Sequence, residues 1–167
     1  MNKQNIYIAL EDVRSAYNIG ALMRTCNFYG VFNFILVGYS GNYLTPAGNP
    51  QIHHKVLKTA LGSEKDLDIQ IFRETGDFLD FVQNRDLELI CIEQNENSVK
   101  LNSCDPTATN KSGIVLVFGN EVRGVSDTLL QKADKIIELT RYGNHHSLNI
   151  TTCAGIVLHE FTRKICN

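Results

Sequence analysis

The segment 114–126, IVLVFGNEVRGVS, limits the fold of this chain more than any other stretch. Its apolar run, 114–118, has no polar alternation and is rich in β-branched and aromatic residues. That pattern is typical of a central parallel strand covered on both faces. In open α/β sheets, ligands bind outside the carboxyl ends of such strands. Gly119, Asn120 and Glu121 follow the run directly, so we expect the functional site to include them.

Strand-like and helix-like segments alternate along the chain. Short apolar segments bounded by polar residues, glycine or proline predict strands at 6–10, 32–37, 68–72, 87–92, 114–118 and 135–139. Apolar residues at helical spacing predict helices at 19–29, 52–60, 75–82, 127–132 and 148–165. This alternation favours an α/β fold with a mostly parallel sheet and helices on both faces.

Polar residues are expected to cap several of these helices at their N-termini. Asn18 is the natural N-cap of helix 19–29, while Ser126 and Ser147 precede helices 127–132 and 148–165. A threonine or an aspartate is expected to open helix 75–82. These caps would place Asn18 and Ser147 at helix starts in any protein of this shape.

Composition narrows the class of protein. A chain of 167 residues suits a single domain spanning 1–167. The N-terminus is polar and leads straight into the first predicted strand, so we expect no signal peptide. The longest apolar runs are far shorter than the ~20 residues of a membrane span. A soluble cytoplasmic protein without a membrane segment is therefore expected.

Cysteine usage and net charge exclude further classes. The five cysteines show no paired CxxC spacing, so we expect buried, reduced thiols and no metal site. The formal net charge is −2. Proteins that bind nucleic acid usually carry a basic surplus, so any basic surface on this chain must be local.

Two nucleotide-binding classes can be excluded from the loops that follow predicted strands. A dinucleotide-binding domain should have a GxGxxG turn after its first strand, but the segment 11–16 contains no glycine. A P-loop is suggested by Gly119, Gly124 and Ser126, but Val125 stands where the phosphate-binding lysine must be.

Three polar segments remain, and together they carry a family resemblance. NIGALMRTCNFYG at 18–30, LVFGNEVRGVS at 116–126 and SLNITTCAG at 147–155 resemble the three signature motifs of the SpoU (TrmH-like) branch of the SPOUT methyltransferases. The resemblance extends from residue 6 to residue 164. It implies transfer of a methyl group from S-adenosylmethionine to a ribose 2′-hydroxyl of tRNA or rRNA. It also implies a C-terminal deep trefoil knot and a homodimer with the substrate cleft at the subunit junction.

The same resemblance implies roles for individual residues. The residues implied in catalysis are Arg24, Asn18, Glu121, Ser147 and Asn149. The residues implied in binding S-adenosylmethionine are Gly119, Asn120, Leu139, Arg141, Gly143, Ser147 and Leu148. The residues expected to contact RNA are Arg14, Arg24, Arg123 and Arg141. Because the first strand begins at residue 6, no appended RNA-binding domain is expected, and recognition falls to the loops 39–50 and 93–111.

Arg24 also has a role that follows from helix geometry and acid–base chemistry. It lies roughly 150° from the centre of the apolar stripe of its predicted helix and should therefore face solvent. In this family such an arginine is often proposed as the general base. A guanidinium has a pKa above ~12 and is a poor base. We therefore favour bidentate binding of a substrate phosphate and stabilisation of the developing alkoxide.

The sequence departs from the family pattern at Val122, where glycine is most common, and at Thr140 and Arg141, where proline and methionine are usual. A β-branched residue disfavours positive φ, so Val122 bears on the shape of its loop. These departures leave a non-catalytic RNA-binding homologue as an alternative. A base methyltransferase on the same fold is a second alternative. The remaining cationic groups would form a basic track when doubled by a twofold axis; they are Arg14, His53, His54, Lys55, Lys58, Arg123, Arg141, His145 and His146.

Overall fold

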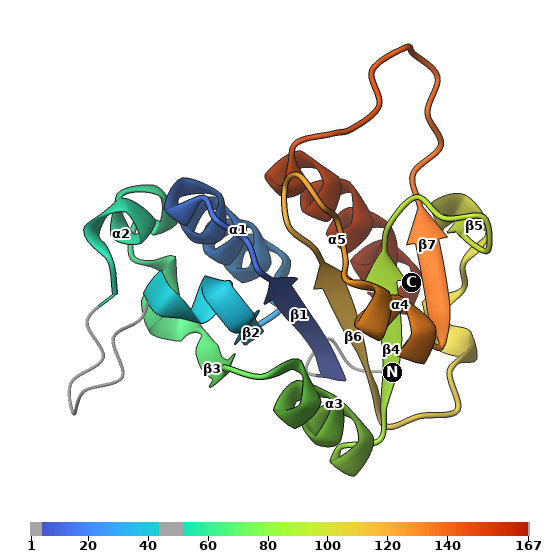
Figure 1. The fold of residues 1–167 in the computed structure, drawn as a ribbon, viewed down its shortest axis with the longest axis horizontal. Coiled ribbons are helices and arrows are strands. Elements are labelled where there is room, and N and C mark those ends of the chain that lie inside the picture. Colours follow the sequence, from blue (N-terminus) through green and yellow to red (C-terminus); the bar gives the residue numbers. More distant parts are fainter. Residues whose placement is uncertain (1–4, 44–51, 167) are drawn as a thin grey trace.

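The computed structural model describes residues 5–43 and 52–166 and contains a parallel seven-stranded sheet in the order β3-β2-β1-β6-β4-β7-β5. Figure 1 shows this sheet running through the middle of the molecule, with helices on either side. The strands are β1 (Ile6–Glu11), β2 (Asn33–Val37), β3 (Asp68–Phe72), β4 (Leu87–Ile92), β5 (Val99–Lys100), β6 (Gly113–Phe118) and β7 (Lys135–Glu138). The α/β class predicted from the alternating pattern is confirmed.

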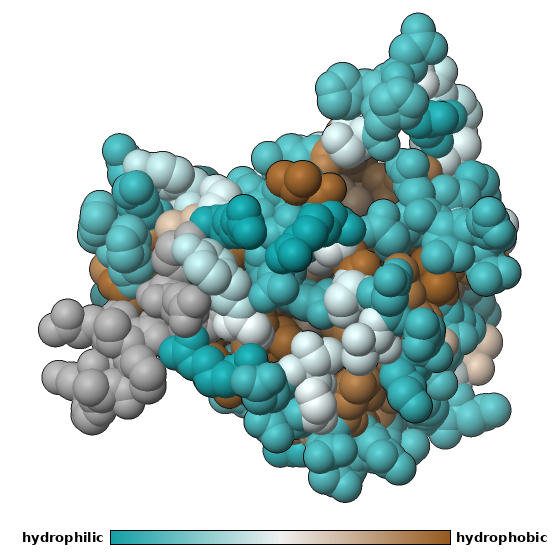
Figure 2. Space-filling model, in the orientation of Figure 1, coloured by the Kyte–Doolittle hydropathy of each residue, from teal (hydrophilic) through white to brown (hydrophobic). Residues whose placement is uncertain are grey.

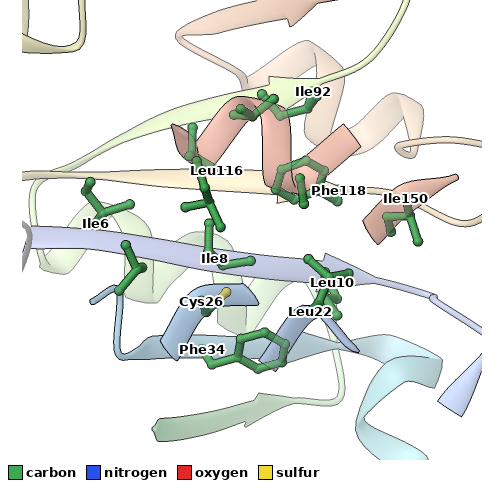
Figure 3. Packing of buried hydrophobic residues seen from close by; sticks show 14 of the residues in the cluster. Ile6, Ile8, Leu10, Leu22, Cys26, Phe34, Ile92, Leu116, Phe118 and Ile150 are labelled. Atoms are coloured by element: carbon green, nitrogen blue, oxygen red, sulfur yellow. The ribbon is translucent and has the colours of Figure 1, made fainter. Parts of the chain in front are cut away.

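Helices cover both faces of the sheet and close two separate hydrophobic clusters. They are α1 (Ala16–Tyr29), α2 (His54–Ala60), α3 (Thr75–Asn84), α4 (Asp127–Lys132) and α5 (Ile150–Cys166). Buried residues of α1, α2 and α5 share one cluster, and those of α3 and α4 share the other. Figure 3 shows the first cluster, in which Leu22 of α1 lies close to Leu10 of β1 and Cys26 of α1 lies close to Ile8. Helices α1, α2 and α5 therefore lie on one face of the sheet.

The central position of β6 determines which loops meet. All of its residues are buried, as its uninterrupted apolar sequence predicts. In the sheet register, Phe118 pairs with Leu10 of β1 and with Ile92 of β4. The three strands therefore end side by side, and Glu11, Glu93 and Gly119 leave the sheet at the same edge.

Helix α1 packs closely on α2 because its contact surface includes a glycine. A Cβ on Gly20 would lie 2.1 Å from the carbonyl oxygen of Val56 and 2.3 Å from Oγ1 of Thr59. The Thr59 hydroxyl also donates a hydrogen bond of 2.9 Å to the carbonyl oxygen of Tyr17. These contacts hold α1 and α2 as one unit.

Several predicted helix starts are wrong, although the elements themselves are confirmed. Helix α1 begins at Ala16, and its N-cap is Ser15, whose Oγ accepts the Asn18 amide; Asn18 lies inside the first turn. Helix α3 follows Glu74, which makes no side-chain capping bond, so neither a threonine nor an aspartate caps it. Ser126 caps α4 as predicted, by accepting the amide of Leu129.

Candidate active site

A cavity of about 440 Å³ opens at the carboxyl ends of β6 and β7. Its walls come from the ends of β4, β6 and β7, from the loop after β6, and from the segment that leads into α5. The predicted site residues that line it are Gly119, Asn120, Glu121, Leu139, Ser147, Leu148 and Asn149. Residues of the second and third polar segments therefore meet at one cavity.

The loop after β6 turns back on itself at two glycines. A Cβ on Gly119 would lie 2.2 Å from the carbonyl carbon of Gly124 and from the amide nitrogen of Val125. Asn120 and Gly124 exchange backbone hydrogen bonds of 3.0 and 2.9 Å. Gly124 has a φ of +72°, and an added Cβ would lie 2.1 Å from Oε2 of Glu93. The loop therefore requires glycine at both positions.

Val122 fits this loop without strain. Its side chain is 87% exposed, and it is not one of the described non-glycine residues with positive φ. Gly124 supplies the left-handed conformation that the turn needs. The departure from glycine at position 122 therefore changes the surface of the loop and leaves its backbone intact.

Two carboxylates, at the ends of the strands on either side of β6, hold the far side of the loop. Glu11 is only 4% exposed and accepts hydrogen bonds from the Ser126 amide at 2.8 Å and the Ser126 hydroxyl at 2.5 Å. Glu93 accepts the Val125 amide at 3.0 Å. The sequence-based site did not include either glutamate, although an acidic residue at the end of a buried strand is the signal that marks both.

Asn120 joins the loop to the segment after β1. It is 6% exposed, and its Nδ2 donates a hydrogen bond of 2.8 Å to the carbonyl oxygen of Asp12. Its Oδ1 accepts the amides of Val122 at 2.9 Å and Arg123 at 3.1 Å. The side chain of Asn120 therefore binds the protein's own backbone and shapes the cavity wall.

Glu121 connects the cavity to the start of α1. Its carboxylate accepts hydrogen bonds from the amides of Arg14 and Ser15, at 3.0 and 3.1 Å, and from Nδ2 of Asn18 at 3.0 Å. Partial burial raises the pKa of this carboxyl, but the hydrogen bonds outweigh it, and the net pKa is lowered from its ordinary value of 4.5. Glu121 therefore stays ionised at neutral pH and fixes the first turn of α1 against the cavity.

The variant Glu121→Gln is expected to lower the free energy of unfolding by about 1 kcal/mol at pH 7, a figure that allows for solvent screening of this exposed carboxylate. An amide nitrogen cannot accept the N–H of Arg14, so one hydrogen bond is lost. Since folding depresses the carboxyl pKa, its contribution is complete above 4.5 and disappears as pH falls through the folded-state pKa. Urea denaturation of both proteins at neutral and acidic pH measures this difference, and a pH-independent gap would contradict it.

The segment between β7 and α5 projects from the body of the molecule (Figure 1), and its surface is mainly hydrophilic (Figure 2). All residues from 140 to 149 are exposed. Nη1 of Arg141 lies 2.9 Å from Nδ1 of His146, and Gln94 donates a hydrogen bond of 3.2 Å to the His146 carbonyl oxygen. Arg141 and Gly143 are not among the described residues that line the cavity. Arg141 therefore contacts His146 of the cavity wall without lining the cavity itself.

Asn149 caps helix α5, so the predicted cap at Ser147 is wrong. Oδ1 of Asn149 accepts the amide of Thr151 at 2.8 Å and its hydroxyl at 2.5 Å. The Ser147 amide and carbonyl oxygen instead lie within 3.5 and 3.0 Å of Nδ1 of His145. Ser147 therefore precedes the helix on the open side of the cavity.

Arg24 is exposed on α1, as its distance from the apolar stripe predicts. It does not line the cavity of its own chain. It lies in a second hollow of about 530 Å³, together with Phe28, Lys58, Thr151 and Thr152. Asn149, Ile150 and Cys153 line the first cavity, so the first turn of α5 separates the two hollows.

The other predicted RNA-binding arginines lie near the start of α1. Arg14 is exposed, and its backbone amide is held by Glu121. The Arg123 guanidinium is 69% exposed and lies 3.9 Å from the Asp12 carboxylate. The loop 39–50, also expected to recognise RNA, lies partly outside the described residues.

The thiol in the cavity wall is unreactive at neutral pH. Burial, with a smaller contribution from Glu93, raises the pKa of Cys153 to about 11. Cys26, Cys91 and Cys104 are buried and, like Cys153, free. Over residues 5–43 and 52–166 no group of histidine, cysteine and acidic residues could hold a metal ion. The site therefore offers polar and charged side chains for binding, and no thiolate nucleophile.

The family model of the SpoU rRNA Methylase family matches residues 5–159 of this chain. The chain belongs to that family. The resemblance inferred from the three motifs is thus confirmed. Among curated relatives of this SpoU-family chain, the tRNA (guanosine(18)-2′-O)-methyltransferase of Aquifex aeolicus is 28% identical over 163 residues, covering 97% of this chain and 71% of the relative.

Solved structures agree with this membership. The A. aeolicus TrmH/SpoU tRNA modifying enzyme superposes with a TM-score of 0.78 at 27% identity, covering 96% of this chain and 75% of that one. An AdoMet-bound rRNA methyltransferase from Sinorhizobium meliloti superposes with a TM-score of 0.83 at 25% identity, covering 100% of this chain and 59% of that one.

None of the helices described here is long and apolar enough to cross a membrane.

Proposed function

We propose that this SpoU-family protein transfers a methyl group from S-adenosylmethionine to a ribose 2′-hydroxyl of tRNA or rRNA. The observation that carries the proposal is the cavity at the ends of β6 and β7, where the second and third motifs meet. The A. aeolicus relative is named a tRNA 2′-O-methyltransferase, and the S. meliloti structure is an rRNA methyltransferase with AdoMet bound. Both names support the donor and the acceptor class.

The cavity suits S-adenosylmethionine in size and charge. Its volume of about 440 Å³ falls within the range of small-molecule sites. Leu139 and Leu148 offer apolar contacts for an adenine ring, and the backbone at Gly119 offers a close approach. Among the described residues, the lining includes three glutamates but neither lysine nor arginine, which favours a ligand with a cationic sulfonium and ammonium. When bound, the donor supplies a methyl group whose bond to sulfur breaks as a bond to the ribose oxygen forms.

Arg24 is proposed to bind the RNA phosphate next to the target ribose and to stabilise the developing alkoxide. A guanidinium presents paired N–H donors that match a phosphate, and it stays protonated at neutral pH. Asn18 and Glu121 set the position of α1 and therefore of Arg24. Ser147 and Asn149 shape the entrance where the ribose would lie. The hydroxyl proton is released to solvent water.

We extend the proposal to a homodimer, because Arg24 and the donor cavity do not meet within one chain. Two exposed apolar residues line the second hollow, Phe28 at 81% and Leu61 at 65% exposure; Ile156, 44% exposed, follows Thr152 of the same hollow on α5. Apolar groups exposed together mark interaction surfaces. A second copy packed on α1 and α5 would cover them and bring its own donor cavity to Arg24.

The variant Ile156→Asp is expected to be monomeric, because packing a second copy on α5 would bury an unpaired carboxylate. Its affinity for S-adenosylmethionine should stay near that of the wild type, and its methyl transfer should fall at least about tenfold. Light scattering coupled to gel filtration measures the mass. A wild-type protein that is monomeric and fully active would contradict the dimer.

The function itself is tested with the purified protein, S-adenosylmethionine carrying a labelled methyl group, and total tRNA or rRNA. Digestion to nucleosides should give a labelled 2′-O-methylnucleoside. A labelled base would indicate a base methyltransferase. Binding of both ligands without any transfer would indicate a non-catalytic RNA-binding homologue. Either result would overturn the proposal.

The same family membership supports three further expectations from the sequence. They are a trefoil knot formed by the C-terminal segment, a single-domain organisation over 1–167 and a cytoplasmic location. The seven-stranded parallel sheet and its match to SpoU structures support the expectation of a knot. Hydrogen exchange offers a test of the knot, since a threaded α5 should exchange only on global unfolding.

A further inference from the structure

The residues of α1 and α2 supply cations and aromatic rings but no carboxylates; the carboxylates of Glu121 and Asp66 reach α1 only at Asn18 and Asn27 among the described residues. Neither helix contains an aspartate or a glutamate, although the formal net charge of the chain is −2. Arg24 on α1 and Lys55 and Lys58 on α2 are all exposed. Among the described residues, these three side chains form no ion pair. The positive charges of these three side chains are therefore exposed and not paired with a carboxylate of the described residues.

Tyr17 adds an aromatic ring to this surface. It is 44% exposed, and the ammonium of Lys55 lies 6.0 Å from its ring centroid. Tyr17 and Arg24 are seven residues apart on α1, so they lie about 10 Å apart along one side of the helix. Lys58 lines the same hollow as Arg24. Tyr17 with Lys55, and Arg24 with Lys58, therefore form two groups on the surface shared by α1 and α2.

The packing of α1 on α2 fixes these side chains' helices relative to each other. The close contact at Gly20 and the Thr59 hydrogen bond to Tyr17 join the two helices. Glu121 fixes the N-terminal turn of α1, which contains Asn18, next to Tyr17. The surface therefore keeps a constant position relative to Arg24.

We propose that the surface formed by Tyr17, Lys55 and Lys58 binds a single-stranded stretch of RNA next to the methylated nucleotide. Lysine side chains neutralise phosphates, and an exposed aromatic ring stacks on an unpaired base of any sequence. The inference deepens the proposed function and rests on it, because Arg24 would hold a phosphate of the same strand. The ring and the spacing favour a nucleic acid over an acidic protein, which would not need a stacking surface.

The test measures binding of a short fluorescent oligouridine, its duplex with oligoadenine, and oligoglutamate as an acidic peptide. The variants are Lys55→Ala, Lys58→Ala, Tyr17→Leu and Tyr17→Phe. Lys132→Ala is the matched control, because Lys132 is exposed on α4, which packs on the opposite face of the sheet. Calorimetry with S-adenosylmethionine checks that each variant keeps its donor cavity.

Each lysine variant is expected to weaken oligouridine binding about three- to tenfold and to reduce the slope of log K against log salt by about 0.7. Tyr17→Leu should weaken binding about tenfold, and Tyr17→Phe should bind like the wild type. Variants that all bind like Lys132→Ala would overturn the inference. Oligoglutamate or duplex bound as tightly as oligouridine would overturn it too. Failure of the proposed function is distinguishable, because it appears as absent methyl transfer by the wild type.

Discussion

Replacing Arg24 by lysine is expected to reduce methyl transfer at least about 100-fold, because lysine keeps the charge and loses the paired donors that bind a phosphate. Arg24 does not line the cavity of its own chain. Because the proposed partner of Arg24 is the RNA phosphate, the affinity for S-adenosylmethionine should stay within about twofold of the wild type. Single-turnover rates with saturating RNA and calorimetric titration of the donor measure the two quantities separately.

The control for this variant is Arg85→Lys, since Arg85 is a surface arginine stacked on Phe81 of α3, away from the candidate site. It should transfer methyl groups at the wild-type rate. Nearly full activity of Arg24→Lys would exclude bidentate phosphate binding. If the arginine were the general base, the pH–rate profile of the lysine variant would shift towards the lysine pKa of about 10.4.

Replacing Gly119 by alanine is expected to lower donor affinity at least about tenfold and the free energy of unfolding by about 1–3 kcal/mol. The added Cβ would meet backbone atoms of Gly124 and Val125 at 2.2 Å. Backbone atoms cannot rotate away as a side chain can, so the loop has to move. That movement would displace the cavity wall between Asn120 and Glu121. Calorimetry and urea denaturation measure the two effects.

Two other glycines separate this effect from glycine replacement in general. A Cβ on Gly76 or on Gly143 would meet no atom within 4 Å. Gly76→Ala, in α3, should leave donor binding unchanged. Gly143→Ala tests the donor-binding role inferred from the family resemblance, since any loss of affinity there cannot come from a steric clash. Normal donor binding by Gly119→Ala would show that the tight loop is unimportant for the donor.

Six of the seven strands could be predicted because they are local features of the sequence; β5 lies in the segment 93–111, which was predicted as a loop. The uninterrupted apolar run of β6 is fully buried, and the predicted bounds of β3 and β4 agree with the structure. Helix starts were less predictable. Ser15 and Asn18 are both good caps, and the choice depends on Glu121, which binds Asn18 from 103 positions away in the sequence. No local pattern contains that contact.

The candidate site was predictable through its motifs and only partly through its geometry. The motifs identified the residues around Gly119 and Leu148 that line the cavity. They did not identify Glu11 and Glu93, whose partners in the loop follow from the order of strands in the sheet. They also did not indicate that Arg24 lies across the first turn of α5 from the donor cavity. The catalytic, donor-binding and RNA-binding roles of individual residues stay predictions.

The position of the first turn of α5 between the two hollows has a genetic consequence. In the proposed dimer, each reaction centre takes its arginine from one gene product and its donor loop from the other. A strain that carries one allele defective at Arg24 and another defective at Gly119 would form mixed assemblies, half of whose centres contain both intact parts. Two recessive loss-of-function alleles would then restore modified RNA together, although neither allele does so alone.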